Sequence, residues 1–396
     1  MTVVRSFHVL AKPTGAVCNL DCAYCFFLQK EDLYPGSTFR MSDDVLEAYL
    51  RQTIASEPSD TVTVAWQGGE PTLMGLDFFR RAHEIARGLM PSGKQLAYTI
   101  QTNGTRLDDA LCDFFREHQY LVGLSVDGPR HLHDAYRVDK AGRGSFDRVM
   151  HGFEQLKAHN VDVNVLTAVN AANGDHGLEV YRFVRDEMGV RYLQLIPIVE
   201  RVGPDGRTGM QAGTTVTDRS VSSEQWGRFM IEIFDEWVRR DVGDMFVLNF
   251  DWALASWVGM ESPVCIFKET CGGAVALEHT GDLYSCDHFV EPDYLLGNIL
   301  ETDMGVLARS EQQVEFGRAK RTTLPQYCLD CEVRFACNGE CPKNRFIRTP
   351  GGEDGLNYLC AGYKAFFTHI DEPMTMMAGL LRSGRHADEV MALLAR

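Results

Sequence analysis

Three cysteines near the start of the chain have the spacing of a metal-binding loop. Cys18, Cys22 and Cys25 are separated by three and then two residues, on the loop that follows the first predicted strand. Three thiolates on one tight loop can hold three corners of a cubane iron–sulfur cluster. A fully ligated cluster has four protein ligands, so three thiolates leave one iron open to bind and activate a small molecule. The alternative is a zinc site whose fourth ligand lies elsewhere.

Eight further cysteines lie in the last third of the chain. They stand at Cys265, Cys271, Cys286, Cys328, Cys331, Cys337, Cys341 and Cys360. Eight thiolates satisfy two cubane clusters completely, so neither cluster would keep a position for substrate. Zinc ribbons also use paired Cys-x2-Cys, but they rarely need eight thiols. The twelfth cysteine, Cys112, lies in an amphipathic helix pattern, and we interpret it as an inert packed thiol.

Composition narrows the class of protein. The 396 residues carry 39 basic and 55 acidic side chains, a net charge of −16. A duplex nucleic acid needs a basic surface that this chain lacks, and an anionic membrane is disfavoured for the same reason. No apolar run approaches the length of a spanning helix, and the start lacks the apolar region of a signal peptide. We therefore expect a cytoplasmic protein without nucleic-acid or membrane partners, in which clustered cysteines are metal ligands rather than disulfides.

Hydrophobic patterning up to about residue 200 alternates between strands and helices. Strands are expected at 7–12, 62–67, 97–101, 122–126, 161–169 and 192–199. Helices are expected at 43–57, 76–89, 107–118, 146–159 and 178–188. This alternation predicts parallel βαβ units, and the apolar strands indicate a sheet that is covered on both faces. Six units predict an incomplete (β/α)6 barrel of the α/β class, although a doubly wound sheet gives a similar pattern.

The rest of the chain is less regular. Residues 201–221 are rich in Gly and Thr without periodicity, which is typical of a functional or disordered loop. A helix is expected at 224–240. Residues 260–370 have few long apolar runs, so they should bury little core and fold around metal, and 376–396 should form two short helices. The predicted domains are a barrel domain over 1–240, a cluster domain over 241–370 and a helical tail over 371–396.

The first cysteine motif, with Tyr24 before its third cysteine, resembles the radical S-adenosylmethionine (SAM) superfamily. Segments that match it follow later strands: Gln67-Gly-Gly-Glu-Pro71, Gln101-Thr-Asn-Gly104 and Ser125-Val-Asp-Gly-Pro. The resemblance implies that SAM chelates the open iron. One electron then cleaves it to methionine and a 5′-deoxyadenosyl radical, which abstracts hydrogen from the substrate.

The same resemblance implies a set of SAM contacts at one end of the barrel. These are Tyr24 by the adenine, Gly69, Ser125, Arg137 and the backbone near Val199. A serine hydroxyl suits the ribose, a guanidinium suits the carboxylate, and a glycine lets the backbone approach the ligand. Their positions at successive strand ends fit the face on which barrel sites assemble.

The later cysteines resemble the SPASM extension of radical SAM enzymes. That resemblance implies one auxiliary cluster on Cys265, Cys271, Cys286 and Cys341, and a second on Cys328, Cys331, Cys337 and Cys360. Together with the first motif this makes three [4Fe–4S] clusters. Full ligation implies that the auxiliary clusters transfer electrons rather than bind substrate.

Longer motifs are similar to the anaerobic sulfatase-maturating enzyme family. They include Cys18-Asn-Leu-Asp-Cys-Ala-Tyr-Cys-Phe-Phe, Gln67-Gly-Gly-Glu-Pro-Thr-Leu-Met, Leu121-Val-Gly-Leu-Ser-Val-Asp-Gly-Pro and Tyr284-Ser-Cys-Asp-His-Phe-Val. The resemblance implies radical oxidation of a Cys or Ser side chain to Cα-formylglycine, within a Cys/Ser-x-Pro-x-Arg segment of an unfolded sulfatase. It also implies an electron donor such as ferredoxin or flavodoxin.

Asp287 matches the proposed catalytic base of that family. Transfer of a proton from a thiol of pKa near 8.5 to a carboxylate of pKa about 3.9 is uphill by roughly 6 kcal/mol. Transfer from a serine hydroxyl is more strongly uphill. Either burial raises the pKa of Asp287, or deprotonation follows hydrogen abstraction; we favour the second, helped by the first. His288 is interpreted as structural. Phe27 stands where many relatives carry Tyr, so a role for that phenol is absent here.

Two other hypotheses fit parts of the sequence. One is a SPASM enzyme that forms thioether or carbon–carbon crosslinks in a precursor peptide, although such enzymes often carry an N-terminal recognition domain. The other is a non-enzymatic zinc-binding interaction protein, which metal analysis would separate from an iron–sulfur enzyme. The sequence leaves open whether Cys, Ser or both are oxidised, and which sulfatase, electron donor and oligomeric state apply.

Overall fold

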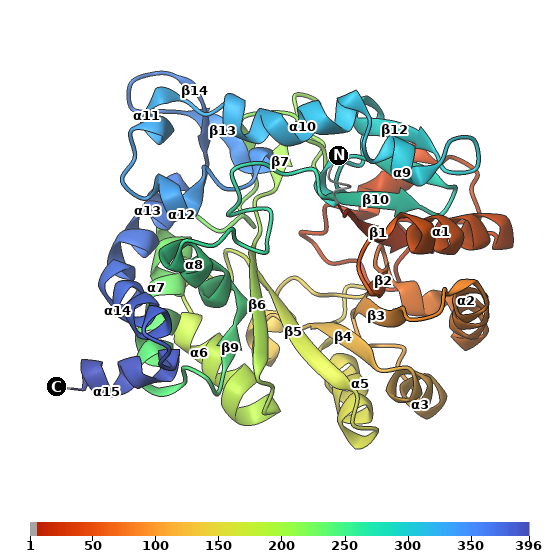
Figure 1. The fold of residues 1–396 in the computed structure, drawn as a ribbon, viewed down its shortest axis with the longest axis horizontal. Helices are drawn as coiled ribbons and strands as arrows, with labels where there is room; N and C mark the ends of the chain where they lie inside the picture. The colour runs from red at the N-terminus through yellow and green to blue at the C-terminus, as the bar shows by residue number, and fades with distance from the viewer. Residues whose placement is uncertain (1–5, 396) are drawn as a thin grey trace.

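The core of the fold is an open parallel sheet in a computed structural model that describes residues 6–395. The predicted barrel strands are β1 (His8–Lys12), β2 (Thr61–Trp66), β3 (Gln95–Thr102), β4 (Tyr120–Ser125), β5 (Asp162–Val169) and β6 (Tyr192–Pro197). They pair in chain order, each parallel to the next. The predicted incomplete barrel of the α/β class is therefore confirmed (Figure 1).

Helices that follow these strands cover the outer face of the sheet. They are α1 (Asp43–Ser56), α2 (Leu76–Leu89), α3 (Asp109–Glu117), α4 (Arg130–His133), α5 (Phe146–Ala158) and α6 (Gly177–Arg182), with shorter turns η1 (Leu28–Leu33), η2 (Pro71–Met74) and the π-helical η3 (Phe183–Met188). The side chains of Val62, Val64 and Trp66 on β2 are fully buried among residues of α1 and α2. This packing leaves the loops at the carboxyl ends of the strands to form a site.

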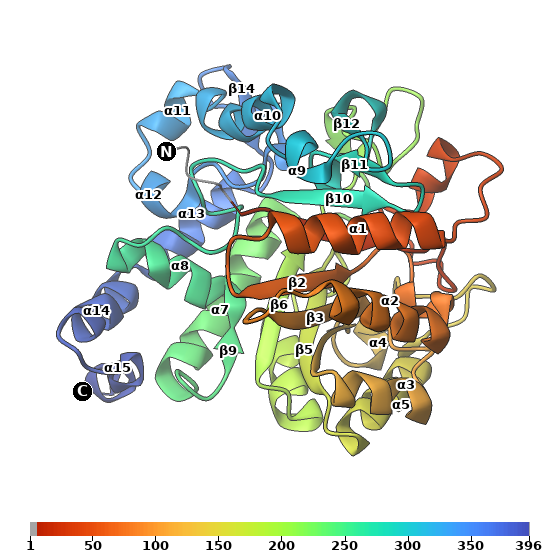
Figure 2. The same cartoon turned by 45° about the vertical axis from the view of Figure 1, so that its right-hand side comes forward.

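The cysteine-rich region continues the barrel sheet, which the sequence did not predict. Its elements are β10 (Ala274–Glu278), β11 (Asp282–Tyr284), η4 (Asp287–Phe289), η5 (Pro292–Tyr294), β12 (Leu295–Asn298), α9 (Met304–Leu307), α10 (Glu311–Thr322), α11 (Gln326–Leu329), α12 (Arg334–Cys337), η6 (Pro342–Asn344), β13 (Arg345–Arg348) and β14 (Asp354–Asn357). Strand β10 pairs in parallel with β1 and carries the fully buried Val275 and Leu277. Figure 2 shows β10 together with β11 and β12, which continue the sheet. The expectation that this region has little core is wrong, because its strands share the core of the barrel.

Helices pack at the other edge of the sheet, beyond β6. They are α7 (Ser223–Arg240), α8 (Leu248–Val258), α13 (Cys360–His369), α14 (Asp371–Arg382) and α15 (Val390–Leu394), with the short β9 (Phe246–Val247) and η7 (Ala387–Glu389). Phe234 of α7, Phe250 of α8 and Phe366 of α13 meet in one fully buried aromatic cluster. The two tail helices expected over 376–396 are α14, which begins earlier at Asp371, and α15.

Residues 201–216 form an antiparallel hairpin with two-residue strands and an irregular loop between them. The strands are β7 (Arg201–Val202) and β8 (Thr215–Val216), and Thr217 N bonds the carbonyl of Glu200 at 3.0 Å. Across residues 6–395, the helices are all too short or too polar to span a membrane.

Candidate active site and cluster sites

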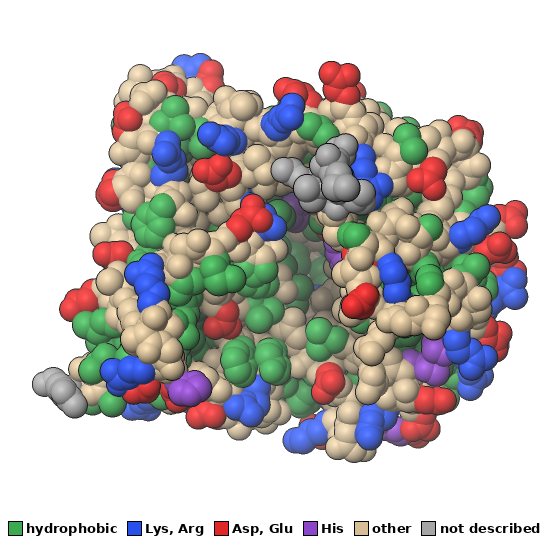
Figure 3. All heavy atoms as spheres, in the orientation of Figure 1, with side chains coloured by type: hydrophobic (Ala, Val, Ile, Leu, Met, Phe, Trp, Pro, Cys, Tyr) green, Lys and Arg blue, Asp and Glu red, His purple; other side chains and the backbone are tan. Residues whose placement is uncertain are grey.

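The loop after β1 and the turn after β11 lie together at the carboxyl ends of the barrel strands, because Lys12 at the end of β1 pairs with Asp287 after β11. On the face toward the viewer, the space-filling view shows a hollow at the middle with hydrophobic side chains around it (Figure 3). The loop with Cys18, Cys22 and Cys25 follows β1, and Asp287 follows β11. Residues far apart in sequence thus reach one place, because β10 and β1 are neighbours.

The first three cysteines are brought together on a loop that the barrel holds by its backbone. Asp21 N donates to the carbonyl of Val138 at 2.8 Å, and Ala23 N donates to that of Tyr136 at 2.9 Å. Burial is the largest of the effects that raise the pKa of Cys18 to about 11 and that of Cys22 to about 12, and the neighbouring cysteines of the loop contribute to both values. Close, partly buried thiols of this kind ionise when a metal supplies positive charge. They therefore fit the cluster that the motif implies.

A buried carboxylate supports this loop, and the sequence analysis missed it. Glu70 is fully buried and accepts hydrogen bonds from the backbone of Asn103 at 2.7 Å and from the hydroxyls of Thr72 and Thr102, each at 2.7 Å. The Asn103 amide in turn donates to Cys18 Sγ at 3.5 Å. Both residues lie inside the Gln67–Pro71 and Gln101–Gly104 segments, but nothing in the sequence indicates that these segments bond to each other. Glu70 and Asn103 thus orient the first cysteine.

Gly69 is required by packing against the cysteine loop. Its N–H donates to the carbonyl of Gly15 at 2.8 Å, and a Cβ at this position would lie 2.1 Å from the carbonyl oxygen of Val17. The sequence predicts that this glycine allows close approach of a ligand. The structure adds a different reason, which is close approach of two backbone segments.

Gly69→Ala is therefore expected to destabilise the protein by about 1–3 kcal/mol, because the backbone of Val17 must move. The measurement is the thermal unfolding midpoint under anaerobic conditions. Gly88→Ala is the matched control, since a Cβ on Gly88 in α2 meets nothing within 4 Å. Equal unfolding midpoints for Gly69→Ala and the wild type would show that the loop can move without loss of stability.

Tyr24 and Arg137 share a buried carboxylate, Asp127, that the sequence analysis did not single out. The Tyr24 hydroxyl donates to Asp127 Oδ2, and Arg137 Nε lies 3.0 Å from the same oxygen. All three side chains are buried. Asp127 thus fixes the guanidinium beside the Tyr24 ring, whose centroid lies 5.6 Å from Arg137 Cζ.

The remaining two predicted SAM contacts also lie at strand ends. Ser125 is the last residue of β4, and its hydroxyl accepts from Gln101 Nε2 at 3.0 Å. Val199 lies two residues beyond the end of β6 and is buried. The structure therefore places these residues along the same sheet edge as Tyr24, Gly69 and Arg137, while their role as SAM contacts remains a prediction.

Asp287 forms an ion pair with Lys12 at the end of β1. The Lys12 side chain is 2% exposed, and its ammonium also lies 3.8 Å from the ring centroid of Phe27. Burial alone would raise the pKa of Asp287, but the ammonium of Lys12 outweighs it and holds the pKa below its usual value. The expectation that burial raises this pKa is therefore wrong, because nothing in the sequence indicates that Lys12 reaches Asp287. Burial lowers the pKa of His288 to about 3, so that ring is neutral near pH 7.

The hairpin of residues 201–216 contacts the same region. Gln211 donates its backbone N–H to Glu291 Oε1 at 2.8 Å and its side-chain amide to the carbonyl of His288 at 3.1 Å. On its other side, Thr208 accepts a hydrogen bond of 2.6 Å from Gln29, which follows the first cysteine motif. The hairpin therefore joins the first cysteine loop to the turn that carries Asp287.

Four later cysteines gather beside Asp287. Cys265 and Cys271 lie between α8 and β10, Cys286 follows β11, and Cys341 precedes η6. Burial raises the pKa of Cys286 well above its usual value, and the nearby Cys341 and Cys265 raise it further. Burial is likewise the largest of the effects that raise the pKa of Cys271 to about 11 and that of Cys341 to about 12. Cys265 contributes to both values. We call these four residues the Cys265 set.

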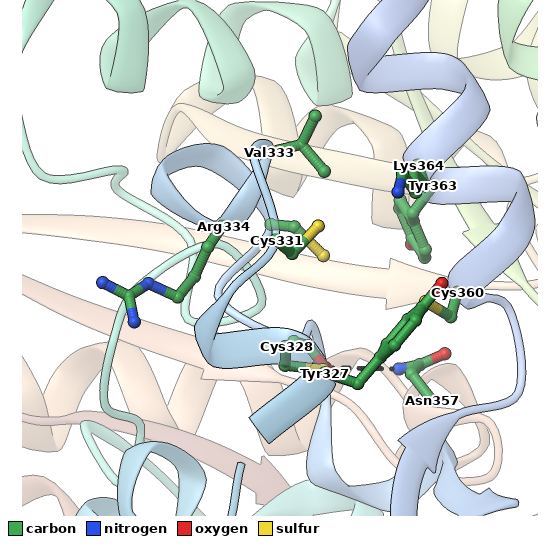
Figure 4. Close-up of a pocket in the computed structure, with 11 residues that line it drawn as sticks. Tyr327, Cys328, Cys331, Val333, Arg334, Asn357, Cys360, Tyr363 and Lys364 are labelled. Carbon is green, nitrogen blue, oxygen red and sulfur yellow. Dashed lines mark hydrogen bonds between the residues drawn. The ribbon is translucent and has the colours of Figure 1, made fainter. Parts of the chain in front are cut away.

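The other four cysteines line one cavity. Cys328 lies on α11, Cys331 follows it, Cys337 ends α12 and Cys360 begins α13. All four line the cavity, which is drawn in close-up with the chain segments that carry them (Figure 4). Burial is the largest of the effects that raise the pKa of Cys337 to about 12, and the neighbouring Cys360 contributes to that value. This Cys328 set and the Cys265 set are the two groups that the SPASM resemblance implies.

Comparisons with known proteins agree with this arrangement. The model of the radical SAM superfamily matches residues 13–184, and that of the SPASM iron–sulfur cluster-binding domain matches residues 265–332. The solved structure of native anSMEcpe with bound AdoMet superposes with a TM-score of 0.84 at 28% identity, and the match covers 94% of this chain and 99% of that one. Fold and cysteine motifs thus define a radical SAM enzyme with a SPASM domain, as predicted.

Two curated relatives narrow the class further. The serine-type anaerobic sulfatase-maturating enzyme of Bacteroides thetaiotaomicron is 44% identical over 397 residues, which is 98% of this chain and 95% of that protein. The cysteine-type enzyme of Clostridium perfringens is 30% identical over 368 residues, or 91% of this chain and 95% of that protein. The chain belongs to the anaerobic sulfatase-maturating enzyme family. This membership favours sulfatase maturation over the crosslinking and zinc-binding hypotheses.

Proposed function

We propose that this enzyme oxidises a serine side chain, within a Ser-x-Pro-x-Arg segment of an unfolded sulfatase, to Cα-formylglycine. The proposal rests on the position of Asp287, a partly buried carboxylate that pairs with Lys12 at the end of β1 and adjoins Cys286 of the Cys265 set. The preference for serine over cysteine rests on the higher identity to the serine-type relative, 44% against 30%.

Cys18, Cys22 and Cys25 would hold a [4Fe–4S] cluster with one iron free of protein ligands. Tyr24, Gly69, Ser125, Arg137 and Val199 would line the SAM beside it. When bound there and reduced by one electron, SAM supplies a 5′-deoxyadenosyl radical that removes hydrogen from the substrate carbon. Asp127 holds Arg137 in place for the SAM carboxylate, since an anchored guanidinium loses little freedom when it binds an anion.

Asp287 would accept the hydroxyl proton of the target serine. Lys12 keeps the carboxylate ionised, which leaves it ready to accept but makes it a weak base. Proton transfer from an ordinary hydroxyl is therefore strongly uphill, and it must follow loss of hydrogen from Cβ, when the hydroxyl is more acidic. The side chain then loses one hydrogen atom, one proton and one electron in all, which converts the alcohol to the aldehyde.

The remaining electron would leave through the cysteine sets of the SPASM domain. We propose that the Cys265 set and the Cys328 set each hold a fully ligated [4Fe–4S] cluster, so that the protein carries three. The Cys265 set includes Cys286, the residue next to Asp287, and is therefore placed to take the electron first. A ferredoxin or flavodoxin would supply the electron that starts the reaction.

The proposal is tested with two peptides that differ only in Ser or Cys at the target position. Anaerobic enzyme, SAM and reductant are incubated with each, and the products are read by mass spectrometry. We expect the serine peptide to lose a pair of hydrogens and to react with a hydrazide, as an aldehyde does. Conversion of the cysteine peptide alone would contradict the serine assignment, and conversion of neither would contradict the reaction.

A further inference from the structure

A buried lysine, Lys320 of α10, is tied to the loop that carries two cysteines of the Cys265 set. It is fully buried, and its ammonium donates to the carbonyls of Cys265, Ile266 and Lys268 at 2.5, 2.8 and 2.6 Å. An ammonium has three donors, so this arrangement uses all of them. Carbonyl oxygens accept all three of these hydrogen bonds, and Glu340, which is buried, and Arg345 are the charged side chains that act on the ammonium most strongly.

Helix α10 also holds the other end of that loop. Cys271 N donates to the carbonyl of Gly317 at 3.1 Å, and a Cβ on Gly317 would lie 2.4 Å from the carbonyl oxygen of Cys271. Gly317 and Lys320 are three residues apart, so they lie on one face of the helix. The helix therefore fixes the backbone of both Cys265 and Cys271.

Arg345 likewise holds the backbone of the turn between the two cysteine sets. It donates to the carbonyls of Gly339, Asn338 and Glu340 at 2.8, 2.8 and 3.1 Å, and also to the carbonyl of Lys320. These three turn residues all have positive φ, at 71°, 47° and 51°, which costs free energy for Asn and Glu. The turn joins Cys337 of one set to Cys341 of the other, so Arg345 fixes a ligand of each.

We propose that Lys320 and Arg345 position the ligand-bearing segments of both auxiliary clusters, and that their charges raise the reduction potentials of those clusters. The inference rests on the proposed ligation by the two cysteine sets. A fixed cation in a region of low dielectric stabilises the more negative, reduced form of a nearby cluster. This would help the auxiliary clusters to accept the electron that leaves the substrate.

The test replaces Lys320 by Gln, which removes the charge but keeps two donors for the loop carbonyls. Iron content and the midpoint potential of each cluster are measured on the holoenzyme by a redox titration followed by electron paramagnetic resonance. We expect the midpoint of the cluster on the Cys265 set to shift to a more negative value, with no shift for the SAM-binding cluster. Loss of about four iron per chain, confined to that set, would support the positioning role equally.

Arg321→Met is the matched control. It removes a charge from the next residue of the same helix, but Arg321 is exposed and pairs in solvent with Glu269 at 3.2 Å, so we expect no shift. Arg345→Gln is the second variant and is expected to move the midpoints of both auxiliary clusters; it decides the question if Lys320→Gln does not fold. Full iron with unchanged midpoints would overturn the inference, whereas a wild type without auxiliary clusters would overturn the ligation proposal itself.

Discussion

Asp287→Asn is expected to cleave SAM at close to the normal rate but to lose most of its aldehyde formation. The amide cannot accept the serine proton, and general-base catalysis is worth about 10²–10⁴-fold in rate. The expected signature is 5′-deoxyadenosine that accumulates without formylglycine, both quantified by mass spectrometry. Aldehyde yield equal to that of the wild type would remove Asp287 from the reaction.

The Asp287→Asn result needs a check of folding and iron content and a control variant. Asp287 neighbours Cys286 and neutralises the buried Lys12, so the variant should retain full iron and a comparable unfolding midpoint before its activity is read. Asp293→Asn removes an exposed carboxylate from the same segment and should leave both products unchanged. A parallel loss in the Asp293 variant would indicate a general effect of charge rather than a proton acceptor.

Cys25→Ala is expected to abolish SAM cleavage and to remove about four iron per chain, since a cluster with two protein ligands is not retained. The auxiliary clusters should remain, with their spectra intact. Iron analysis and the yield of 5′-deoxyadenosine measure the two effects separately.

Cys112→Ala is the control for the loss of a thiol. Cys112 is fully buried on α3 among apolar side chains of the barrel core. Its replacement should cost some stability but no iron and no SAM cleavage. If Cys25→Ala retained iron and activity as Cys112→Ala does, the first cysteine loop would not hold the cluster.

The sequence predicts the elements whose signals are local. Six strands and their helices follow from hydrophobic periodicity, and the grouping of cysteines follows from their spacing together with a family resemblance. The pairing of β10 with β1 could not be predicted in this way, because it joins residues more than 260 positions apart. That pairing brings Asp287 to the first cysteine loop.

The supporting residues of the site were missed for a related reason. Glu70, Asn103 and Asp127 act through partners on other strands, and a buried polar residue gives no periodic signal of its own. Lys12 had the largest consequence, since it reverses the expected direction of the Asp287 pKa. Lys12 reaches Asp287 because β1 and the turn after β11 lie side by side, and the sequence does not indicate that arrangement.

The radical formed on the barrel is expected to remove hydrogen from the target side chain itself. A peptide with deuterium on Cβ of the target serine distinguishes this from other sources of hydrogen. Incubated anaerobically with enzyme, SAM and reductant, it should give 5′-deoxyadenosine that contains the deuterium, in proportion to the aldehyde formed. Aldehyde formed without deuterium in the nucleoside would show that the radical does not act on the target side chain.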